Sequence, residues 1–558
     1  MKTTAKICAL FLVVAVPLLA NPILSHKYTA DPQPIVWNDR LYIYASNDDE
    51  SIVESEGYVI RAYTLVSTDD MVNWTDHGEV FRVPRDWNRG NATSARAYAP
   101  GAAVKDNMVY LYPCGAGGPV GVVTAPHPEG PFTDVKNGVP LVQANTCSNC
   151  GVPWLFDPAV FVDDDGSGYL YYGGGDANGN PGPGQNMRVI KLNNDMISLP
   201  LGANATTVSA PRSFEAAYMH KRGDTYYFSY VNNWAGGDSH PNAAIMYMTG
   251  SSPMGPFTLR GPVLRNPAIG NNNINRSNNN HHGIIEYKGK WYIVYHDRRV
   301  GNAIGNTNGT TVSVNQRNIS IDSLVYNTDG TMKEVVVTEN GVAQIKNFNP
   351  YAVIGATTLN RQSSTPTTNN QPGIKADSVA NEGMILTRIS NNNWIRLKGV
   401  DFGAGATKVT ARIATKGNGS IEFRTGSNTG TLVATVNITS TNDAWQNFEA
   451  NVSNLSGVKD YLYLVFKVTG EPFRLSSYQF QEAGGGSSSS VTASSSSENA
   501  QSSSSSESIT PIIKIPSMAA NAKSEIYDLR GNKVSGTLPS GVYIEKKRGM
   551  PSKVFVVR

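Results

Sequence analysis

Three acidic residues each open a short apolar segment, where burying a carboxylate costs free energy unless the group has a task. Asp31 opens DPQPIVW, Asp157 opens DPAVFV and Glu215 opens EAAYMH. Most other acids of this region lie in turn sequences, where they act as turn formers and solvated groups. Three such carboxylates, without cysteine or histidine at metal-ligand spacing, indicate general acid–base chemistry. For any one of them a purely structural hydrogen-bonding role stays open.

Hydrolysis of a glycosidic bond is a reaction that such a set of residues could perform. It needs one carboxylic acid to protonate the leaving oxygen and one carboxylate to activate a water molecule. A third carboxylate nearby can raise the pKa of the acid by like-charge repulsion and help to orient it. The three side chains must then converge from distant parts of the chain.

A repeated plan along the chain can bring them together. Five segments combine a polar anchor, a short apolar strand, a hairpin-type turn and a Tyr-rich strand. The segments begin at Asp31, Ala99, Asp157, Glu215 and His281, at intervals of 58 to 68 residues. Each repeat supplies enough strands for one four-stranded blade, and radial repetition of blades leaves only short sheet edges.

The sequence therefore predicts an all-β protein in which residues 21–345 form a five-bladed β-propeller. The first strand of every blade lines the central channel of a propeller, so Asp31, Asp157 and Glu215 are expected to meet there. The alternative is a β-sandwich with Tyr-rich hairpins that arose by chance.

The same residues carry a family resemblance. YTADPQPIVWNDRLYIYAS, FDPAVFVDDDGSGYLYYGG and SFEAAYMHKRGDTYYFSYV resemble, in this order, the three signature segments of glycoside hydrolase family 43. The resemblance implies a five-bladed propeller that inverts the anomeric centre. It also implies that Asp31 is the general base, Glu215 the general acid, and Asp157 the residue that tunes and orients the acid.

Aromatic residues near the acids are candidates for a sugar-binding platform, because sugar rings stack on aromatic faces. They are Trp154, Phe156 and Trp234. His281 opens the fifth repeat, and the resemblance implies a histidine near the channel in a structural or substrate-side role. A water-mediated role beside calcium is the alternative, since calcium prefers oxygen ligands. We assign no metal ligand and expect no required cofactor, and a structural Ca²⁺ ion stays open.

The N-terminus predicts export. Residues 1–20, MKTTAKICALFLVVAVPLLA, read as a signal peptide, and the apolar run is shorter than the roughly 20 residues of a membrane span. We expect a protein that is secreted or held on a bacterial cell surface. Of the remaining cysteines, Cys114, Cys147 and Cys150, export favours a local disulfide with one cysteine free and disfavours a metal site; the pairing stays open.

The charge balance excludes one class of partner. The chain has 47 basic and 44 acidic residues, and only 16% of its residues are charged. A nucleic-acid binder would show a clustered basic excess, so we expect no nucleic-acid partner. We also expect no membrane span and a monomer. The family resemblance implies arabinoxylan or a related plant cell-wall polysaccharide as the partner.

The second half of the chain predicts a β-sandwich at residues 352–482. WIRLKGVDFGAGATKVTARIAT resembles a family 6 carbohydrate-binding module, and Trp394 and Trp445 fall at its usual cleft aromatics. Gly355-Ala356-Thr357 replaces the usual Glu-Ala-Glu, and Arg474 stands near the end, where an Asn often meets the sugar. We expect weakened sugar binding; the alternative is a module that only packs against the propeller.

Two further segments complete the predicted organisation. Residues 484–508 form a Ser-rich linker. Residues 509–558 alternate apolar and polar residues around turns and resemble C-terminal sorting or attachment domains of bacteria.

The resemblances together imply a secreted, inverting glycoside hydrolase that removes α-L-arabinofuranosyl side chains from arabinoxylan. One alternative is a β-xylosidase or xylanase of the same family. An alternative of another class is a non-catalytic carbohydrate-adhesion protein, which would be expected to have lost at least one of the three carboxylates.

Overall fold

The computed structural model describes most of the chain from residue 20 to residue 484 and four strands near the C-terminus. The described ranges are 20–49, 57–83, 96–115, 118–175, 185–302, 315–363, 373–484, 524–528, 533–534, 541–547 and 553–557. The predicted signal peptide, except Ala20, and the predicted linker, except residue 484, lie outside these ranges. The chain divides into two compact units, residues 1–486 and 487–558.

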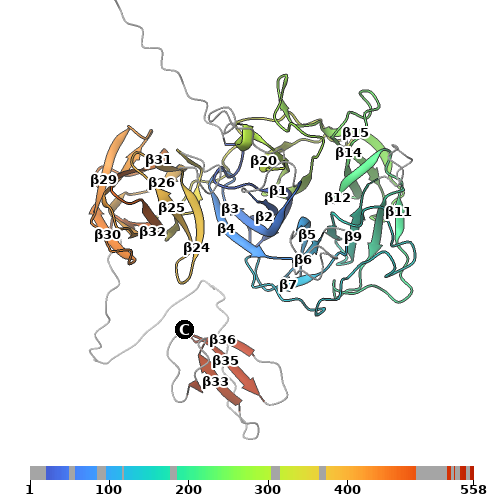
Figure 1. Ribbon diagram of the computed structural model, residues 1–558, viewed down its shortest axis with the longest axis horizontal. Coiled ribbons are helices and arrows are strands. Elements are labelled where there is room, and N and C mark those ends of the chain that lie inside the picture. Colours follow the sequence, from blue (N-terminus) through green and yellow to red (C-terminus); the bar gives the residue numbers. More distant parts are fainter. Residues whose placement is uncertain are drawn as a thin grey trace, which may run out of the picture. The chain divides into compact units, whose positions relative to one another are not determined.

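Five antiparallel sheets follow one another around a ring in the first part of the chain (Figure 1). The predicted all-β fold with a five-bladed propeller is confirmed. Blade I contains β1 (Ala30–Trp37), β2 (Arg40–Asp48), β3 (Ile60–Thr68) and β4 (Trp74–Phe81). Blade II contains β5 (Tyr98–Lys105), β6 (Met108–Cys114) and β7 (Val123–Ala125), and blade III contains β8 (Ala159–Val162), β9 (Gly168–Gly173), β10 (Met187–Lys191) and β11 (Thr206–Val208).

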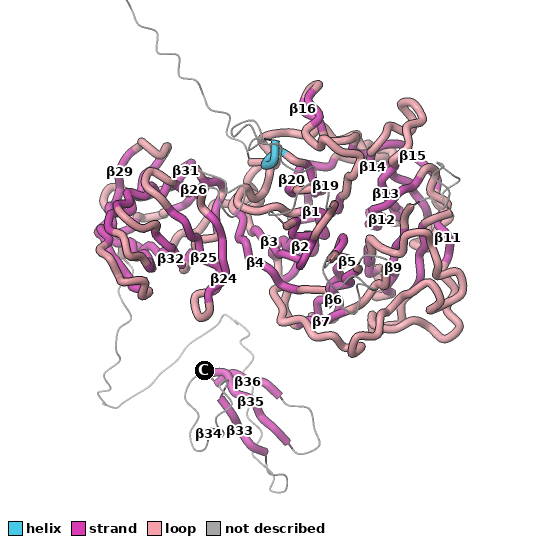
Figure 2. The backbone as a smooth tube through the Cα atoms, in the orientation of Figure 1, coloured by secondary structure: helices cyan, strands magenta, loops and turns pink. Residues whose placement is uncertain are grey.

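Blade IV contains β12 (Ser213–Arg222), β13 (Thr225–Asn232), β14 (Ala244–Gly250) and β15 (Thr258–Leu264). The small hairpin β16 (Ala268–Ile269) and β17 (Asn272–Asn273) leads to blade V, which contains β18 (His282–Tyr287), β19 (Lys290–Asp297) and β20 (Asn318–Leu324). Within the described residues, blades II and V therefore have three strands, where the repeat predicted four. The single helical turn of the described residues spans 299–302 (Figure 2).

The segment before blade I closes the ring. The N–H of Ile23 donates to the carbonyl of Ile319 (2.9 Å), and that of Thr29 donates to the carbonyl of Arg317 (2.8 Å). The first residues of the propeller therefore cover the outer edge of its last blade.

The many tyrosines connect neighbouring blades. A hydroxyl of each blade donates to a carbonyl of the next: Tyr44 to Pro128, Tyr112 to Met196, Tyr171 to Pro253, Tyr227 to Gly330 and Tyr287 to Asp39, at 2.6–2.9 Å. A buried tyrosine combines a large apolar ring with a hydroxyl that needs a partner. The Tyr-rich strands thus supply both the packing between blades and a circle of inter-blade hydrogen bonds.

Two sheets pack face to face in the second part, so the predicted β-sandwich is also confirmed. One sheet has the order β24-β25-β32-β27-β30, with β21 on β32, and the other has the order β23-β26-β31-β28-β29. Phe402, Phe423, Phe466 and Phe480 lie in the core between them. The strands are β21 (Ile354–Gly355), β22 (Thr358–Leu359), β23 (Arg361–Gln362), β24 (Lys375–Val379), β25 (Gly383–Ile389), β26 (Trp394–Asp401), β27 (Ala406–Ala414), β28 (Asn418–Thr425), β29 (Thr431–Ile438), β30 (Gln446–Asn451), β31 (Val458–Thr469) and β32 (Phe473–Glu482).

One strand of the second part belongs to the propeller. β22 pairs with β4, so that blade I becomes a five-stranded sheet. Asn360 donates to the carbonyl of Val72 (2.8 Å), and the side chain of Asn73 both donates to and accepts from the backbone of Lys398 (2.8 Å each). The propeller and the sandwich are therefore joined by strand pairing as well as by the covalent chain.

The C-terminal unit contains an antiparallel sheet in the order β34-β33-β35-β36. Its strands are β33 (Ser524–Asp528), β34 (Lys533–Val534), β35 (Gly541–Lys547) and β36 (Lys553–Val557). The expected small β-module is present, and its sorting or attachment role stays a prediction. No helix in the described part of the chain has the length and apolar character needed to cross a bilayer.

Candidate active site

The structure brings the three predicted carboxylates into one cavity. Asp31 lies near the start of β1, Asp157 just before β8, and Glu215 near the start of β12, on the innermost strands of blades I, III and IV. All three are buried and line a cavity of about 630 Å³. The repeat is the reason: equivalent positions of equivalent strands lie at the same end of the channel.

An unusual backbone conformation directs these side chains. Asp31 and Asp157 have φ angles of 51° and 49°, and Ala216, which follows Glu215, has 59°. The β1–β2 register shifts between Ala30 and Gln33, and the β12–β13 register shifts on both sides of Glu215. Such left-handed positions cost of order 1–3 kcal/mol each, and bulges redirect side chains. Regular backbone geometry is thus interrupted at the points where the carboxylates enter the cavity.

Asp31 is held in its ionised form. Nη1 of Arg317 donates to Oδ1 of Asp31 (2.6 Å), and Nδ1 of His296 lies 3.3 Å from the same oxygen. Burial alone would raise the pKa of Asp31, but Arg317 and His296 outweigh it and hold that pKa well below its usual range. A carboxylate that stays ionised can accept a proton, as a general base must.

Glu215 and Asp157 have the opposite tendency. Burial, reinforced by the charge of Asp31, raises the pKa of Glu215 to about 8. Burial and the neighbouring Glu215 raise the pKa of Asp157 well above its usual value. Oδ2 of Asp157 also accepts a hydrogen bond from the backbone N–H of Ala216 (3.2 Å), which fixes the chain at Glu215. The cavity therefore contains one carboxylate held in its ionised form, Asp31, together with two carboxyl groups of raised pKa, Glu215 and Asp157.

Aromatic rings line the cavity on the side of blades III and IV. Trp154 and Phe156 line it as predicted, and Phe214 does so as well. Trp154 packs edge-to-face on Phe156 (5.6 Å between centroids) and on Phe214 (5.1 Å). Gly175 leaves room for the Trp154 ring, because a Cβ there would lie 2.5 Å from a ring carbon. Trp154 is 46% exposed, so its ring is available to a ligand.

Trp234 does not line the cavity; it packs edge-to-face on Phe214, at 5.1 Å between centroids. The sequence analysis missed Phe214, although a signal was present. An aromatic residue directly precedes Asp157 as Phe156, and Phe214 directly precedes Glu215 in the same way.

His281 lies between the carboxylates. Its Nδ1 is 3.7 Å from Oδ1 of Asp31 and 3.8 Å from Oδ2 of Asp157. Burial lowers its pKa to about 4, so the ring is neutral near pH 7. Among the described residues, no group of three or more His, Cys, Asp or Glu side chains is arranged to hold a metal ion. A structural calcium ion therefore stays an untested expectation.

Besides Phe214, the cavity lining includes Tyr58, Asn279 and Arg317, which were not predicted either. Arg317 directly precedes the alternating strand NISIDSL (β20), which is the outermost described strand of blade V, so it lacks the position at an inner strand that marks the three acids. Tyr58 and Asn279 lie in polar surroundings in the sequence and have no such signal either.

The two aromatic residues predicted in the sandwich lie on different sheets. Trp394 begins β26 and packs edge-to-face on Tyr463, at 5.2 Å between centroids. Trp445 directly precedes β30, and the guanidinium of Arg474 lies over its ring at 5.2 Å. Neither residue lines the catalytic cavity. Arg474 therefore lies over one face of Trp445, and weakened sugar binding stays a prediction.

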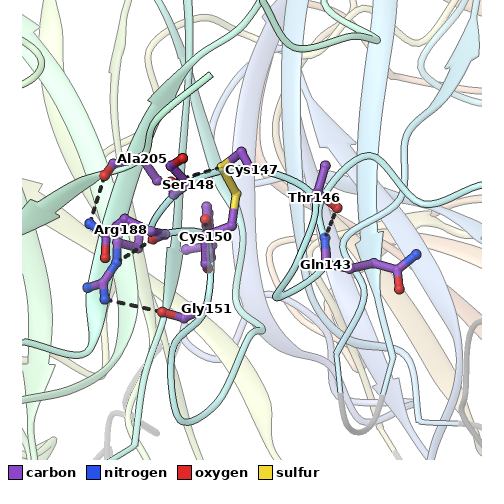
Figure 3. The surroundings of a disulfide bond; sticks show 10 residues. Gln143, Thr146, Cys147, Ser148, Cys150, Gly151, Arg188 and Ala205 are labelled. Carbon is purple, nitrogen blue, oxygen red and sulfur yellow. Dashed lines mark hydrogen bonds between the residues drawn. A yellow bond between two sulfur atoms is a disulfide. The ribbon is translucent and has the colours of Figure 1, made fainter. Parts of the chain in front are cut away.

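A disulfide braces the loop that precedes Trp154. Cys147 is bonded to Cys150, and Cys114 is buried and free, so the expected local disulfide is present. Figure 3 shows the side chain of Arg188 beside this loop, where it donates to the carbonyls of Asn149 (2.8 Å) and Gly151 (3.1 Å).

Comparison with known proteins gives consistent matches to both parts of the chain. Residues 19–332 match the model of glycosyl hydrolases family 43, and residues 362–482 match that of the family 6 carbohydrate-binding module. An arabinoxylan arabinofuranohydrolase of Bacillus subtilis (strain 168) is 39% identical over 499 residues, which are 83% of this chain and 92% of that protein.

An arabinoxylan arabinofuranohydrolase of Paenibacillus polymyxa is 38% identical over 498 residues, which are 83% of this chain and 75% of that protein. The crystal structure of a family 43 arabinoxylan arabinofuranohydrolase from Bacillus subtilis, in complex with cellotetraose, superposes with a TM-score of 0.75 at 37% identity. It covers 84% of this chain and 98% of its own.

Proposed function

Because the chain belongs to glycosyl hydrolase family 43 and is a glycoside hydrolase, we propose that it removes α-L-arabinofuranosyl side chains from arabinoxylan with inversion. The observation that carries the chemistry is the pairing of an ionised Asp31 with a protonated Glu215 in one cavity. The substrate is supported by the likeness to arabinoxylan arabinofuranohydrolases, which extends over the propeller and the sandwich together.

In the proposed reaction Glu215 gives its proton to the glycosidic oxygen as the bond from that oxygen to the anomeric carbon breaks. Asp31 takes a proton from a water molecule whose oxygen bonds to the same carbon from the opposite face. The sugar leaves with inverted configuration, and the two carboxyl groups exchange protons with solvent before the next turnover. Asp157 holds the backbone of Glu215 through Ala216.

The walls of the cavity fit a debranching role. The carboxyl groups are buried, whereas Trp154 is 46% exposed. We propose that one terminal sugar enters the cavity and that Trp154, Phe156 and Phe214 contact the sugars next to it. His281, neutral and close to two carboxylates, is proposed to contact the bound sugar.

The remaining assignments are also proposals. We propose that residues 1–20 direct export, that residues 509–558 attach the protein to a bacterial surface or sort it there, and that the protein is a monomer. We propose that the reaction requires no cofactor, since the two carboxyl groups supply both proton transfers.

An NMR time course of the mature chain on wheat arabinoxylan tests the function. Arabinose that appears first as the β-anomer is expected, with the Glu215→Gln variant as the inactive control. Xylose or xylo-oligosaccharides as products would contradict the proposal and favour the β-xylosidase or xylanase alternative. Binding to the polymer without release of sugar would favour the adhesion protein.

A further inference from the structure

A chain of polar side chains in the wall of the cavity connects the base to the acid. Nη1 of Arg317 donates to Oδ1 of Asp31 (2.6 Å) and to Oδ1 of Asn279 (3.2 Å). Nδ2 of Asn279 then donates to Oε1 of Glu215 (2.9 Å). Asp31 and Glu215 come from blades I and IV, and Arg317 and Asn279 come from blade V, which lies between them in the ring, so the connection follows the wall of the cavity.

The orientation of the Asn279 amide is dictated by its neighbours. A guanidinium has only donors, so the side of the amide that faces Arg317 must be the acceptor Oδ1. The NH₂ group is then left to face Glu215. The backbone also fixes Asn279, since its carbonyl lies 3.2 Å from Nε2 of His296 and its N–H donates to Oγ of Ser277 (3.1 Å).

Asp48 fixes Arg317 from the side away from the cavity. Oδ2 of Asp48 accepts from the backbone N–H (2.8 Å) and from Nε (3.0 Å) of Arg317, and Oδ1 accepts from Nη2 (2.7 Å). The ring of Tyr58 lies 4.6 Å from the guanidinium carbon. The Asp48 side chain is 1% exposed and does not line the cavity, so it cannot touch a substrate there.

We infer that Asp48, Arg317 and Asn279 are positioning residues. They hold the general base and the general acid in a fixed relative position and confine the acid's proton to Oε2 of Glu215. The inference rests on the proposed roles of Asp31 and Glu215. Its reason is geometric: an N–H of Asn279 already points at Oε1, so a proton on that oxygen would face another donor.

This relay of Asp48, Arg317 and Asn279 predicts how the pKa of Glu215 changes when Asn279 is replaced. The hydrogen bond from Asn279 favours the ionised form of Glu215, so its removal raises the pKa of Glu215 further. The other charged or titratable groups around Glu215, which stay in place, are Asp31, Asp157, Arg317 and His281. The proton also becomes free to occupy Oε1, where it is misdirected.

Asn279→Ala, with Asn278→Ala as the matched control, tests the acid side of the relay. Asn278 is the exposed neighbour in the same loop. With an aryl arabinofuranoside, Asn279→Ala should move the basic limb of the kcat profile up by roughly 0.5–1 pH unit. At pH 6 it should lower kcat on arabinoxylan about 10-fold or more. A raised KM with an unmoved limb would overturn the inference and leave Asn279 as a substrate contact only.

Asp48→Asn tests the other end of the relay, where Asp48 fixes Arg317. It keeps the shape of the side chain and removes the charge that fixes Arg317, so kcat should fall about 10-fold with KM unchanged, in a variant whose folding is checked by thermal unfolding. Wild-type kcat in a folded Asp48→Asn variant would contradict the relay.

A ¹³C NMR titration of Glu215, assigned by difference from Glu215→Gln, separates this inference from the proposed function. It needs no turnover, so it judges the relay even if wild type releases no arabinose. An upward shift of the Glu215 pKa in Asn279→Ala supports the relay, and an unchanged pKa refutes it.

Discussion

At the scale of single residues, the site depends on two carboxyl groups of one chemical type that their neighbours drive to opposite protonation states. Asp31 accepts a hydrogen bond from the cationic Arg317, whereas Glu215 accepts one from the neutral amide of Asn279. Both are buried, so the difference comes from the neighbouring charge and not from exposure. A general base and a general acid are thus defined before any substrate binds.

Asp31→Ala tests the role of the base. Hydrolysis should fall by about 10²–10⁴-fold, because no group is left to take the proton of the attacking water. Azide needs no deprotonation, so it should restore turnover in this variant and give a glycosyl azide of inverted configuration, identified by NMR. Wild-type protein should form no azide adduct. A retained configuration in the adduct would contradict the inverting mechanism.

The pH dependence follows from the pKa of Glu215. Activity requires Glu215 protonated, so kcat/KM should be full well below pH 8 and fall as pH rises through about 8. Asp31 sets no limb in the ordinary range, since its pKa is held far below it. Rates on an aryl arabinofuranoside from pH 5 to 10 check this. A basic limb near pH 5 would contradict the raised pKa of Glu215.

The sequence predicted the three carboxylates but not the residues that tune them. Each acid heads an apolar strand, a contrast that a local pattern displays. Asn279 stands in the polar run RSNNNHH, where nothing distinguishes it from its neighbours. Its importance arises from contacts to residues 38 and 64 positions away, Arg317 and Glu215. The left-handed backbone at Asp31 and Asp157 is likewise a product of tertiary context.

At the scale of elements, hairpin repeats predicted the blades because turn chemistry and strand alternation are local. The pairings that finish the sheets are not. The outer partner of β4 is β22 (Thr358–Leu359), and the segment that covers the outer edge of blade V consists of residues before β1. No local pattern marks these segments as parts of the propeller. The sequence therefore predicted the boundary between the propeller and the sandwich but not that β22, beyond this boundary, pairs with blade I.

The loop before Trp154 offers a prediction at this scale. The double variant Cys147→Ser/Cys150→Ser removes a bond across three residues, which a chain-entropy treatment values at about 2 kcal/mol. Arg188 still contacts the carbonyls of Asn149 and Gly151, so the fold should persist while the Trp154 platform loosens. We expect a raised KM on arabinoxylan with kcat on a small aryl glycoside little changed.

Ser148→Ala is the matched control, because Ser148 lies between the two cysteines and its side chain is exposed. Kinetics and thermal unfolding of both proteins, with and without reductant, provide the measurement. An unchanged KM in the double variant would separate the disulfide from substrate binding.

At the scale of the whole molecule, the propeller and the sandwich are one structural unit. Asp76 contributes on the propeller side, with its backbone N–H donating to the carbonyl of Thr357 (3.2 Å) and its carboxylate contacting His26 (2.7 Å) and Lys27 (2.6 Å). The N-terminal segment, blade I and the residue before β22 therefore meet at one buried residue, Asp76. A change in the sandwich can reach the propeller through this junction.

Truncation tests whether the sandwich is a structural part of the catalytic propeller. A chain that ends at residue 484 keeps every contact described between the two parts, so its Tm and activity should equal those of the full chain. A chain that ends at residue 347 loses β22 and the hydrogen bonds to Val72, Asn73 and Asp76. The loss includes four hydrogen bonds, one at Val72, two at Asn73 and one at the backbone N–H of Asp76. At about 1 kcal/mol for each and about 2–4 °C per kcal/mol, its Tm should fall by roughly 8–16 °C.

A point variant makes the same test without removing any chain. Gly78 in β4 has a φ of 76°, and a Cβ there would lie 2.5 Å from Sδ of Met384 in the sandwich. Gly78→Ala should therefore strain blade I and displace the β24–β25 hairpin, and Gly78→Ala with Met384→Ala should recover part of the lost Tm. If the chain that ends at residue 347 has the same Tm as the full protein and Gly78→Ala leaves Tm unchanged, the strand pairing contributes nothing to stability. The sandwich would then be an independent attachment, and its effect on catalysis would have to come from sugar binding alone.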